Sequence, residues 1–254
     1  MEILSAEVMF MIVICLGLAS ITYYKGLLNW DGAVTAFFMA IFISFQGGLT
    51  LILLLLIFLL SAFLATRYRF GYKKERGIQQ GLEGERGWKN VVANGAIPTI
   101  ILLLYSSGPV ANFGFLGAKI VFPLFVASVS AAASDTLASE VGMVSKKTYL
   151  ITNFERVEPG TNGGISLYGE VWAFLGPLYT FLMAQGMFYM ANMYLLPLKI
   201  ILLGTIISFL SCQIDSLLGA TLERKGLMTK SMVNFTSIMI SMIIFGGILW
   251  QIGY

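Results

Sequence analysis

Long apolar runs separated by short polar segments dominate the chain. Several runs approach or exceed the about 20 residues that a helix needs to cross the hydrocarbon core of a membrane. We predict eight spanning helices, at roughly residues 4–23, 32–45, 48–66, 90–106, 119–139, 170–192, 198–220 and 232–252. The second run is short, and its break at Gln46-Gly47-Gly48 is consistent with a tight turn.

The composition indicates lipid as the solvent of these helices. Hydrophobic residues make up 57% of the chain and charged residues 11%, whereas a soluble domain carries about 25% charged residues. The short alternating segments of a membrane β-barrel do not occur. The sequence therefore predicts an all-α polytopic transmembrane bundle, a single integral membrane domain over residues 1–254. A net charge of +3 is too small to indicate nucleic acid as a partner.

The basic residues predict the orientation of the bundle. Of the 16 lysines and arginines, all except Lys119 and Lys199 fall in the segments 24–31, 67–89, 140–169 and 221–231. Cytoplasmic loops carry an excess of lysine and arginine, so these segments are predicted to face the cytoplasm and the N-terminus to lie outside. If residues 32–66 crossed the membrane only once, the N-terminus would change sides and the later loops would not.

The absence of histidine restricts the chemistry. Without it the chain cannot form a Ser-His-Asp or Cys-His triad or a histidine-ligated zinc site. Cys15 and Cys212 both lie in apolar runs, and neither belongs to a CxxC pair. Catalysis would therefore depend on carboxylates, hydroxyls, amides, lysine or arginine, and a hard metal ion.

Two acidic residues lie near the cytoplasmic ends of predicted spans. On a helix, Asp135 shares one face with Ser139 and Gly142. Asp215 lies at a similar depth in the seventh span, and two carboxylates at one depth repel unless a cation such as Mg²⁺ lies between them. Glu140 is about 140° around the helix from Asp135, so it joins this site only if the helix ends or unwinds there. The alternative is that each acid pairs with a nearby lysine or arginine.

A glycine-rich segment follows the fifth span. Its glycines allow positive φ, so successive backbone N–H groups can converge on a phosphate, while threonine and asparagine add side-chain donors. The residues concerned are Pro159, Gly160, Thr161, Asn162, Gly163 and Gly164. A flexible connector is the alternative interpretation.

A polar stripe enters the fourth span. Arg86, Asn90 and Asn94 repeat every four residues, and Lys89 lies beside them. The stripe suits a lipid phosphate, although interhelical hydrogen bonding by the asparagines is a simpler alternative. By the predicted topology, the acids, the glycine-rich segment and the stripe all lie at the cytoplasmic face. Together they are the components of a metal-dependent phosphate-transfer site.

Three motifs carry a resemblance to a known family. They are Asn90-Val91-Val92-Ala93-Asn94-Gly95, Ser134-Asp135-Thr136-Leu137-Ala138-Ser139-Glu140-Val141-Gly142 and Pro159-Gly160-Thr161-Asn162-Gly163-Gly164. In order and spacing they resemble the plastid phytyl-phosphate kinase family and its uncharacterised transmembrane relatives, over roughly residues 30–250. More distantly, the second motif resembles the S-D-x-x-A-x-x-x-G signature of CTP-using prenol kinases and CDP-diacylglycerol synthases. Gly160 and Gly163 replace the lysine and glutamate of their P-K-T-x-E-G segment.

The resemblance implies a CTP-dependent kinase that converts a polyprenyl monophosphate, such as phytyl or geranylgeranyl phosphate, to the diphosphate. On this hypothesis Asp135, Asp215 and Glu140 hold Mg²⁺, and Asn94 orients a phosphate or a metal-bound water. The nucleotide contacts are Ser139, Gly160, Thr161, Asn162, Gly163 and Gly164, and the lipid-phosphate contacts are Arg86, Lys89 and Asn90. Nothing in the residues themselves selects CTP over ATP.

The sequence leaves two other functions open. A lipid cytidylyltransferase would release pyrophosphate and leave a CDP-lipid. The second is a transporter without turnover. Transporters often bind ions near the middle of the membrane and show inverted repeats, whereas the acids here lie near one face and internal repeats are weak. The first apolar run lacks a charged n-region and a cleavage site, and no transit peptide precedes it, so we expect a prokaryotic plasma membrane with the site facing the cytoplasm. The oligomeric state is left open, with a homodimer among the options.

Overall fold

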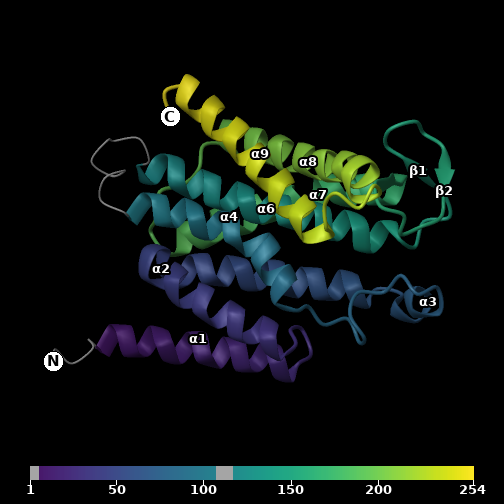
Figure 1. The fold of residues 1–254 in the computed structure, drawn as a ribbon. Helices are drawn as coiled ribbons and strands as arrows, with labels where there is room; N and C mark the ends of the chain where they lie inside the picture. Colours follow the sequence, from purple (N-terminus) through teal and green to yellow (C-terminus); the bar gives the residue numbers. More distant parts are fainter. Residues whose placement is uncertain (1–5, 107–116) are drawn as a thin grey trace.

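The chain folds into a helical bundle, as the sequence predicts (Figure 1). The structure is a computed structural model and describes residues 6–106 and 117–254. Its helices are α1 (Ala6–Tyr24), α2 (Trp30–Arg67), α3 (Phe70–Glu75), α4 (Trp88–Ser106), α6 (Ala118–Gly142), α7 (Leu167–Met190), α8 (Leu198–Leu218) and α9 (Lys230–Gln251). The predicted start of the first span at residue 4 lies outside the described residues.

Within the described residues, 5 helical segments are long and apolar enough to cross a membrane. They are α2, α6, α7, α9, and α8 together with its extension to Glu223. α1 contributes a shorter apolar segment, Val8–Tyr24. The predicted all-α transmembrane architecture is thereby confirmed, whereas the number of crossings and the side of the N-terminus stay predictions.

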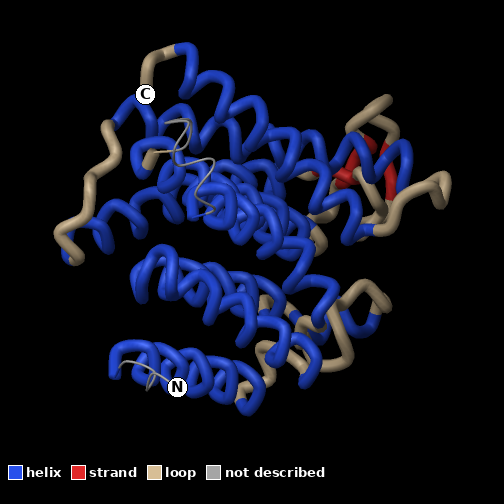
Figure 2. Tube along the Cα trace, turned by 60° about the vertical axis from the view of Figure 1, so that its left-hand side comes forward, coloured by secondary structure: helices blue, strands red, loops and turns tan. Residues whose placement is uncertain are grey.

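α6 lies at the centre of the bundle, packed against α2, α4, α7, α8 and α9. Almost all of its side chains are buried, and serines hold its neighbours close. Ser134 donates to the carbonyl of Ala173 in α7 at 2.6 Å, and Ser208 of α8 donates to the carbonyl of Ala127 at 3.0 Å. Such small polar residues let membrane helices approach closely. α1 lies at the edge of the bundle and packs against α2 (Figure 2).

Polar side chains define where three helices begin. Asn29, Ser166 and Thr229 each accept a hydrogen bond from the backbone N–H three residues on, at the starts of α2, α7 and α9. These caps satisfy N–H groups that have no partner within the helix, and each contributes about 1 kcal/mol.

α2 reverses direction at Gly48, where φ is 66° and ψ is −169°. A straight helix of its 38 residues would be about 57 Å long. Instead both of its ends contact Arg86. The Asn29 N–H donates to the Arg86 carbonyl at 3.1 Å, and Arg86 Nη2 donates to Thr66 Oγ1 at 2.9 Å. α2 therefore consists of two segments that run in opposite directions, and the reversal falls in the turn predicted at residues 46–48 (Figure 1).

A small antiparallel sheet lies between α6 and α7. Its strands are β1 (Thr148–Leu150), β2 (Arg156–Val157) and β3 (Gly164–Ile165), in the order β2-β1-β3. Residues 158–163 connect two strands and are thus held at both ends. The sequence predicts only a loop here, because strands of two or three residues are too short to show a periodic pattern.

A buried ion pair holds α3 on the bundle. Lys73 is fully buried, and its Nζ lies 2.7 Å from Glu140 Oε2 of α6 while donating to the carbonyls of Ala65 and Thr66. Arg86 Nη2 lies 3.8 Å from Glu140 Oε1. Burial lowers the pKa of the Lys73 ammonium and of the Arg86 guanidinium, and the Glu140 carboxylate opposes both shifts. Lys73, Arg86 and Glu140 can therefore stay charged inside the protein only because they lie beside one another.

Replacing Gly48 with alanine is expected to destabilise the fold by about 1–3 kcal/mol, because its backbone conformation is accessible essentially only to glycine. A Cβ at this position would meet no atom within 4 Å, so the cost is conformational and not steric. Thermal unfolding of the detergent-solubilised protein measures the loss. Gly186→Ala in α7 is the matched control, since its Cβ also meets open space but its backbone is helical. Equal losses in both variants would contradict the explanation.

Replacing Lys73 or Glu140 alone is expected to lower the stability of the fold by more than half of the loss caused by replacing both. Lys73→Met and Glu140→Gln each leave a buried charge short of its partner, which typically costs about 3–5 kcal/mol. We expect the double variant to lose clearly less than the sum of the single losses in thermal unfolding. The exposed Lys74–Glu83 pair provides the control cycle, with coupling of at most about 1 kcal/mol. Additive losses at Lys73 and Glu140 would rule out the coupling.

Candidate functional site

Asp135 of α6 and Asp215 of α8 lie side by side at the end of the bundle that carries the small sheet. Their carboxyl groups are close enough to act on each other electrostatically. Both are also held from α9, since the Asn234 amide donates to Asp135 Oδ2 and the Ser237 hydroxyl donates to Asp215 Oδ2, each at 3.2 Å. The structure thus brings together two acids that are 80 positions apart in the sequence (215 − 135 = 80).

The two acids line a cleft of about 90 Å³, termed the acid cleft, together with residues of α6, α7, α8, α9 and the sheet. All of the predicted nucleotide contacts line it as well: Ser139, Gly160, Thr161, Asn162, Gly163 and Gly164. The last five of these, with Pro159, form the glycine loop. Three pieces of sequence that were identified separately therefore meet in one place.

The glycine loop is docked against the end of α8. There a π-helix, η1 (Gly219–Glu223), extends the helix by one turn, and such turns are frequent at functional sites. Gly163 has a φ of 75°, and a Cβ on it would lie 2.4 Å from the backbone nitrogen of Ala220. Gly160 has a φ of 85°, and its Cβ position lies 3.0 Å from Ile78. Close contact as well as conformation requires glycine at both positions, so the loop is a fixed wall of the cleft.

Glycines also bring the N-terminus of α7 to the cleft. A Cβ on Gly142 of α6 would lie 3.4 Å from the Cα of Gly169, so the two helices touch through their backbones. Ser166, which caps α7, and Gly169 both line the cleft. The N-terminus of a helix carries partial positive charge and favours an anion beside it.

The acidic side chains of the cleft suit a metal cation that lies between them and the phosphates of a ligand. Asp135 and Asp215 are joined there by Glu170 and Glu223, and Lys230, the first residue of α9, attracts both aspartates. Across residues 6–106 and 117–254, no three Asp, Glu or Cys side chains converge to enclose an ion by themselves. Mg²⁺ commonly takes one or two carboxylates together with phosphates and water, and the Asp135–Asp215 pair fits that donor set.

Glu140 lies outside the acid cleft, in contrast to its predicted place in the metal site. Its carboxylate pairs with Lys73 and Arg86 on another face of α6. α6 stays helical as far as Gly142, so the angular separation between Asp135 and Glu140 is preserved. The helix neither ends nor unwinds between the two acids, so Glu140 does not join the predicted metal site.

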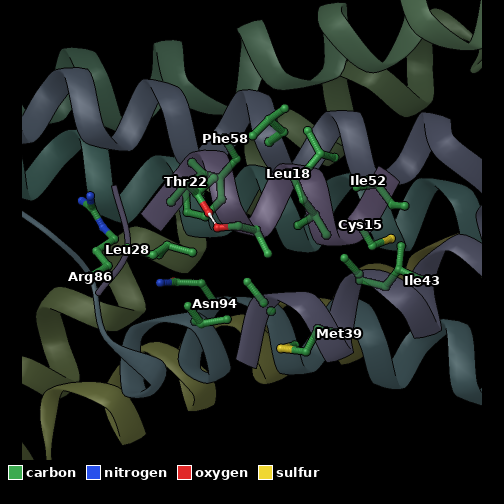
Figure 3. Close-up of a pocket in the computed structure, with 18 of the residues that line it drawn as sticks. Cys15, Leu18, Thr22, Leu28, Met39, Ile43, Ile52, Phe58, Arg86 and Asn94 are labelled. Atoms are coloured by element: carbon green, nitrogen blue, oxygen red, sulfur yellow. Dashed lines mark hydrogen bonds between the residues drawn. The ribbon is translucent and has the colours of Figure 1, made fainter. Parts of the chain in front are cut away.

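The predicted lipid-phosphate contacts also lie apart from the cleft. Arg86, Asn90 and Asn94 line a cavity between α1, α2 and α4, and the described parts of the two linings share no residue (Figure 3). Asn94 donates to the carbonyl of Asn90, one turn earlier in α4, at 2.9 Å, so this hydrogen bond lies within the helix and not between helices. Lys89 is exposed, with its Nζ 5.9 Å from the ring centroid of Trp88. The structure therefore does not join Asn94 to the two aspartates.

Several residues that line the cleft or hydrogen-bond to its two aspartates were not predicted. Lys230, Asn234 and Ser237 are spaced i, i+4 and i+7 at the start of α9, so a polar face was visible in the sequence. Thr148 gave no such signal, because it belongs to a very short strand. Its Oγ1 is buried in the cleft lining and has no hydrogen-bond partner among the described residues.

Comparison with known proteins reveals relatives in archaea and plants. The chain matches the model of a family described as integral membrane protein DUF92 over residues 13–242. An uncharacterized membrane protein of Methanocaldococcus jannaschii is 34% identical over 245 residues, which cover 96% of this chain and 94% of that protein. Protein PGR of Arabidopsis thaliana is 28% identical over 233 residues, covering 87% of this chain and 80% of PGR.

A second protein of Arabidopsis thaliana, the chloroplastic Protein VTE6, is 31% identical over 117 residues, which cover 45% of this chain and 34% of VTE6. No solved structure matches the chain significantly. The family match includes Asp135, the glycine loop and Asp215, and it confirms the relationship that the three motifs indicate. The chain belongs to the DUF92 family of integral membrane proteins.

Proposed function

We propose that this protein is a membrane-embedded, CTP-dependent kinase that phosphorylates a polyprenyl monophosphate to the diphosphate at the cytoplasmic face, with Mg²⁺. The observation that carries the proposal is the acid cleft. In it, two adjacent carboxylates from different helices face a rigid glycine loop. Carboxylates for a metal ion and backbone N–H groups for phosphates are the parts that phosphoryl transfer requires.

The nucleotide phosphates are assigned to the glycine loop. Residues 160–164 line the cleft, as does Thr148, whose hydroxyl has no hydrogen-bond partner among the described residues. Backbone N–H groups of such a loop and the Asn162 amide are suited to bind phosphates. The N-terminus of α7 adds partial positive charge. The more distant CTP-using enzymes carry a lysine and a glutamate in the corresponding segment, where this chain has Gly160 and Gly163. The glycine loop therefore offers neutral groups to the phosphates.

Asp135 and Asp215 would hold the metal ion. When bound, the ion would neutralise part of the negative charge of the phosphates. Asn234 and Ser237 fix the orientation of the two carboxylates, because each donates a hydrogen bond to one of them. Lys230 is the cation that lines the cleft and is suited to contact the transferred phosphate. Glu140 and Asn94 have no role in this arrangement, since the structure holds both elsewhere.

The transfer needs position and charge neutralisation more than a base. An oxygen of the acceptor phosphate attacks the terminal phosphorus of CTP. The bond from that phosphorus to its bridging oxygen breaks, and CDP leaves with the bonding electrons. The acceptor is already anionic, so the lack of histidine is no obstacle. The likeness to the plastid phytyl-phosphate kinase family supports the prenyl acceptor and CTP, and the lysines and arginines of the adjoining loops support the cytoplasmic face.

An apolar groove over α8 and α9 suits the prenyl chain of the acceptor. Ile214 and Leu217, which lie one residue before and two residues after Asp215, line the groove. Gln213 of the same groove donates to Glu170 of the acid cleft at 2.9 Å, so the two spaces adjoin. The outer side chains of the groove are exposed and would face lipid, which allows a membrane-dissolved substrate to enter sideways.

Purified protein with CTP, Mg²⁺ and geranylgeranyl or phytyl phosphate is expected to form the prenyl diphosphate and CDP, detected by mass spectrometry. Asp135→Asn and Asp215→Asn are each expected to lower the rate by about 10²-fold or more, since each removes charge that stabilises the transition state. Removal of Mg²⁺ with EDTA should abolish turnover. Glu155→Gln is the control, because Glu155 is an exposed acid outside the cleft.

The products separate this function from its rivals. Pyrophosphate and a CDP-lipid would identify a cytidylyltransferase. Absence of any diphosphate product with all prenyl phosphates and nucleotides would refute the kinase. If Asp135→Asn then abolished substrate uptake into vesicles, a transporter would take its place.

Gly163→Ala is expected to displace the glycine loop from η1 and lower the kinase rate at least tenfold, because its Cβ would overlap the backbone of Ala220. Faster hydrogen–deuterium exchange over residues 158–165 reports the displacement without any assay of activity. Gly226→Ala is the matched control. Its φ of 72° imposes similar backbone strain, but its Cβ meets open space. Unchanged exchange in Gly163→Ala would contradict the docking of the loop.

A further inference from the structure

The cavity between α1, α2 and α4 is a second space in the bundle, separate from the acid cleft. It measures about 130 Å³, and its walls are almost entirely apolar. Figure 3 shows its elongated form, with Arg86 at one end and Cys15 and Ile43 towards the other. Both segments of α2 line it, so the reversal at Gly48 helps to create it.

One end of this cavity carries polar groups that lack partners. Arg86 and Asn94 are only 6% and 7% exposed. Arg86 Nη1 and Asn94 Oδ1 have no hydrogen-bond partner anywhere in residues 6–106 and 117–254. Buried polar atoms are almost always paired, so two orphaned atoms at one end of an apolar cavity indicate a missing polar group. The guanidinium requires an acceptor, and the amide oxygen requires a donor.

The charges beside this end favour an anion. Lys73 and Arg86 share the single carboxylate of Glu140, so the buried group carries a net charge of +1 (2 − 1 = 1). An uncompensated buried charge is costly, and an anionic head group beside Arg86 would offset it. A phosphate monoester meets all three demands. Its oxygens accept from the guanidinium, its P–OH form donates to Asn94, and its charge neutralises the group.

We propose that this cavity is a binding site for a single-chain isoprenyl or alkyl monophosphate, distinct from the acid cleft. The phosphate lies at Arg86 and Asn94, and the chain extends between α1, α2 and α4 towards Cys15 and Ile43. The cavity measures only about 130 Å³, and its walls are almost entirely apolar. One slender chain therefore suits the cavity better than the two chains of a glycerophospholipid.

Binding of geranylgeranyl monophosphate, measured by native mass spectrometry in EDTA without nucleotide, tests the site. We expect one bound lipid per chain, because without the metal ion the carboxylates of the acid cleft repel a phosphate. Asp215→Asn should retain this lipid, because the cleft acid plays no part in its binding. Ala40→Phe, which fills the cavity without touching its charges, should weaken binding at least tenfold. Arg86→Gln should do the same by removing the charge. Ala191→Leu, at an exposed position outside both cavities, is the control.

Three further probes define the ligand class. Geranylgeraniol, inorganic phosphate and dioleoyl phosphatidic acid are each expected to bind at least tenfold more weakly, because the first lacks the phosphate, the second lacks the chain and the third carries two chains. Binding that survives Ala40→Phe but is lost in Asp215→Asn would place the lipid in the acid cleft and overturn the proposal. Equal binding of phosphatidic acid would overturn the single-chain assignment. The experiment measures no turnover, so its outcome is independent of the kinase assay.

Discussion

The proximity of the carboxyl groups of Asp135 and Asp215 is the constraint on which the rest of the site depends. Two like charges on adjacent helices repel, and a bundle keeps them together only if other groups offset the repulsion. Asn234, Ser237 and Lys230 provide that compensation, and all three belong to the first two turns of α9. α9 is therefore part of the site and not merely a covering helix. Lys230 is exposed and can yield its place beside the acids to a bound cation.

Close helix packing is the second requirement, and residues of the Asp135 motif supply much of it. The Ser134 hydroxyl is directed to α7 and bonds its backbone. Gly142 lets α7 touch α6 at Gly169. Only Asp135, Ala138, Ser139 and Gly142 of this motif line the cleft. The motif thus contains both the acid that lines the cleft and the small residues whose contacts hold α6 and α7 together around it.

The helical architecture and the centre of the site could be predicted from the sequence, because both follow from simple periodicity and composition. Apolar runs indicate the helices, and acids at equal depth together with a glycine-rich segment indicate the cleft. The places where prediction failed have specific causes. Helix periodicity already separates Glu140 from Asp135 around α6. Topology put the Arg86 stripe at the same membrane face as the acids, but it could not show that the stripe lines a different cavity. The role of Lys73, which is fully buried by contacts with α2 and α6, depends on tertiary packing that no local pattern reveals.

α6 separates two sites of opposite charge, and a continuous series of contacts connects them around its end. Arg86, at the head of the apolar cavity, lies beside Glu140, which pairs with Lys73. The Lys73 carbonyl accepts a hydrogen bond from the Ile78 N–H at 3.1 Å, and Ile78 packs against Gly160 of the glycine loop. An anion at Arg86 competes with Glu140 for the guanidinium, which leaves Glu140 more fully to Lys73. Because α3 is held to the bundle through Lys73, an anion bound in the cavity would act on the segment against which the glycine loop rests. The buried ion pair is thus the element through which the two sites would influence each other, provided that it has two arrangements for a ligand to select.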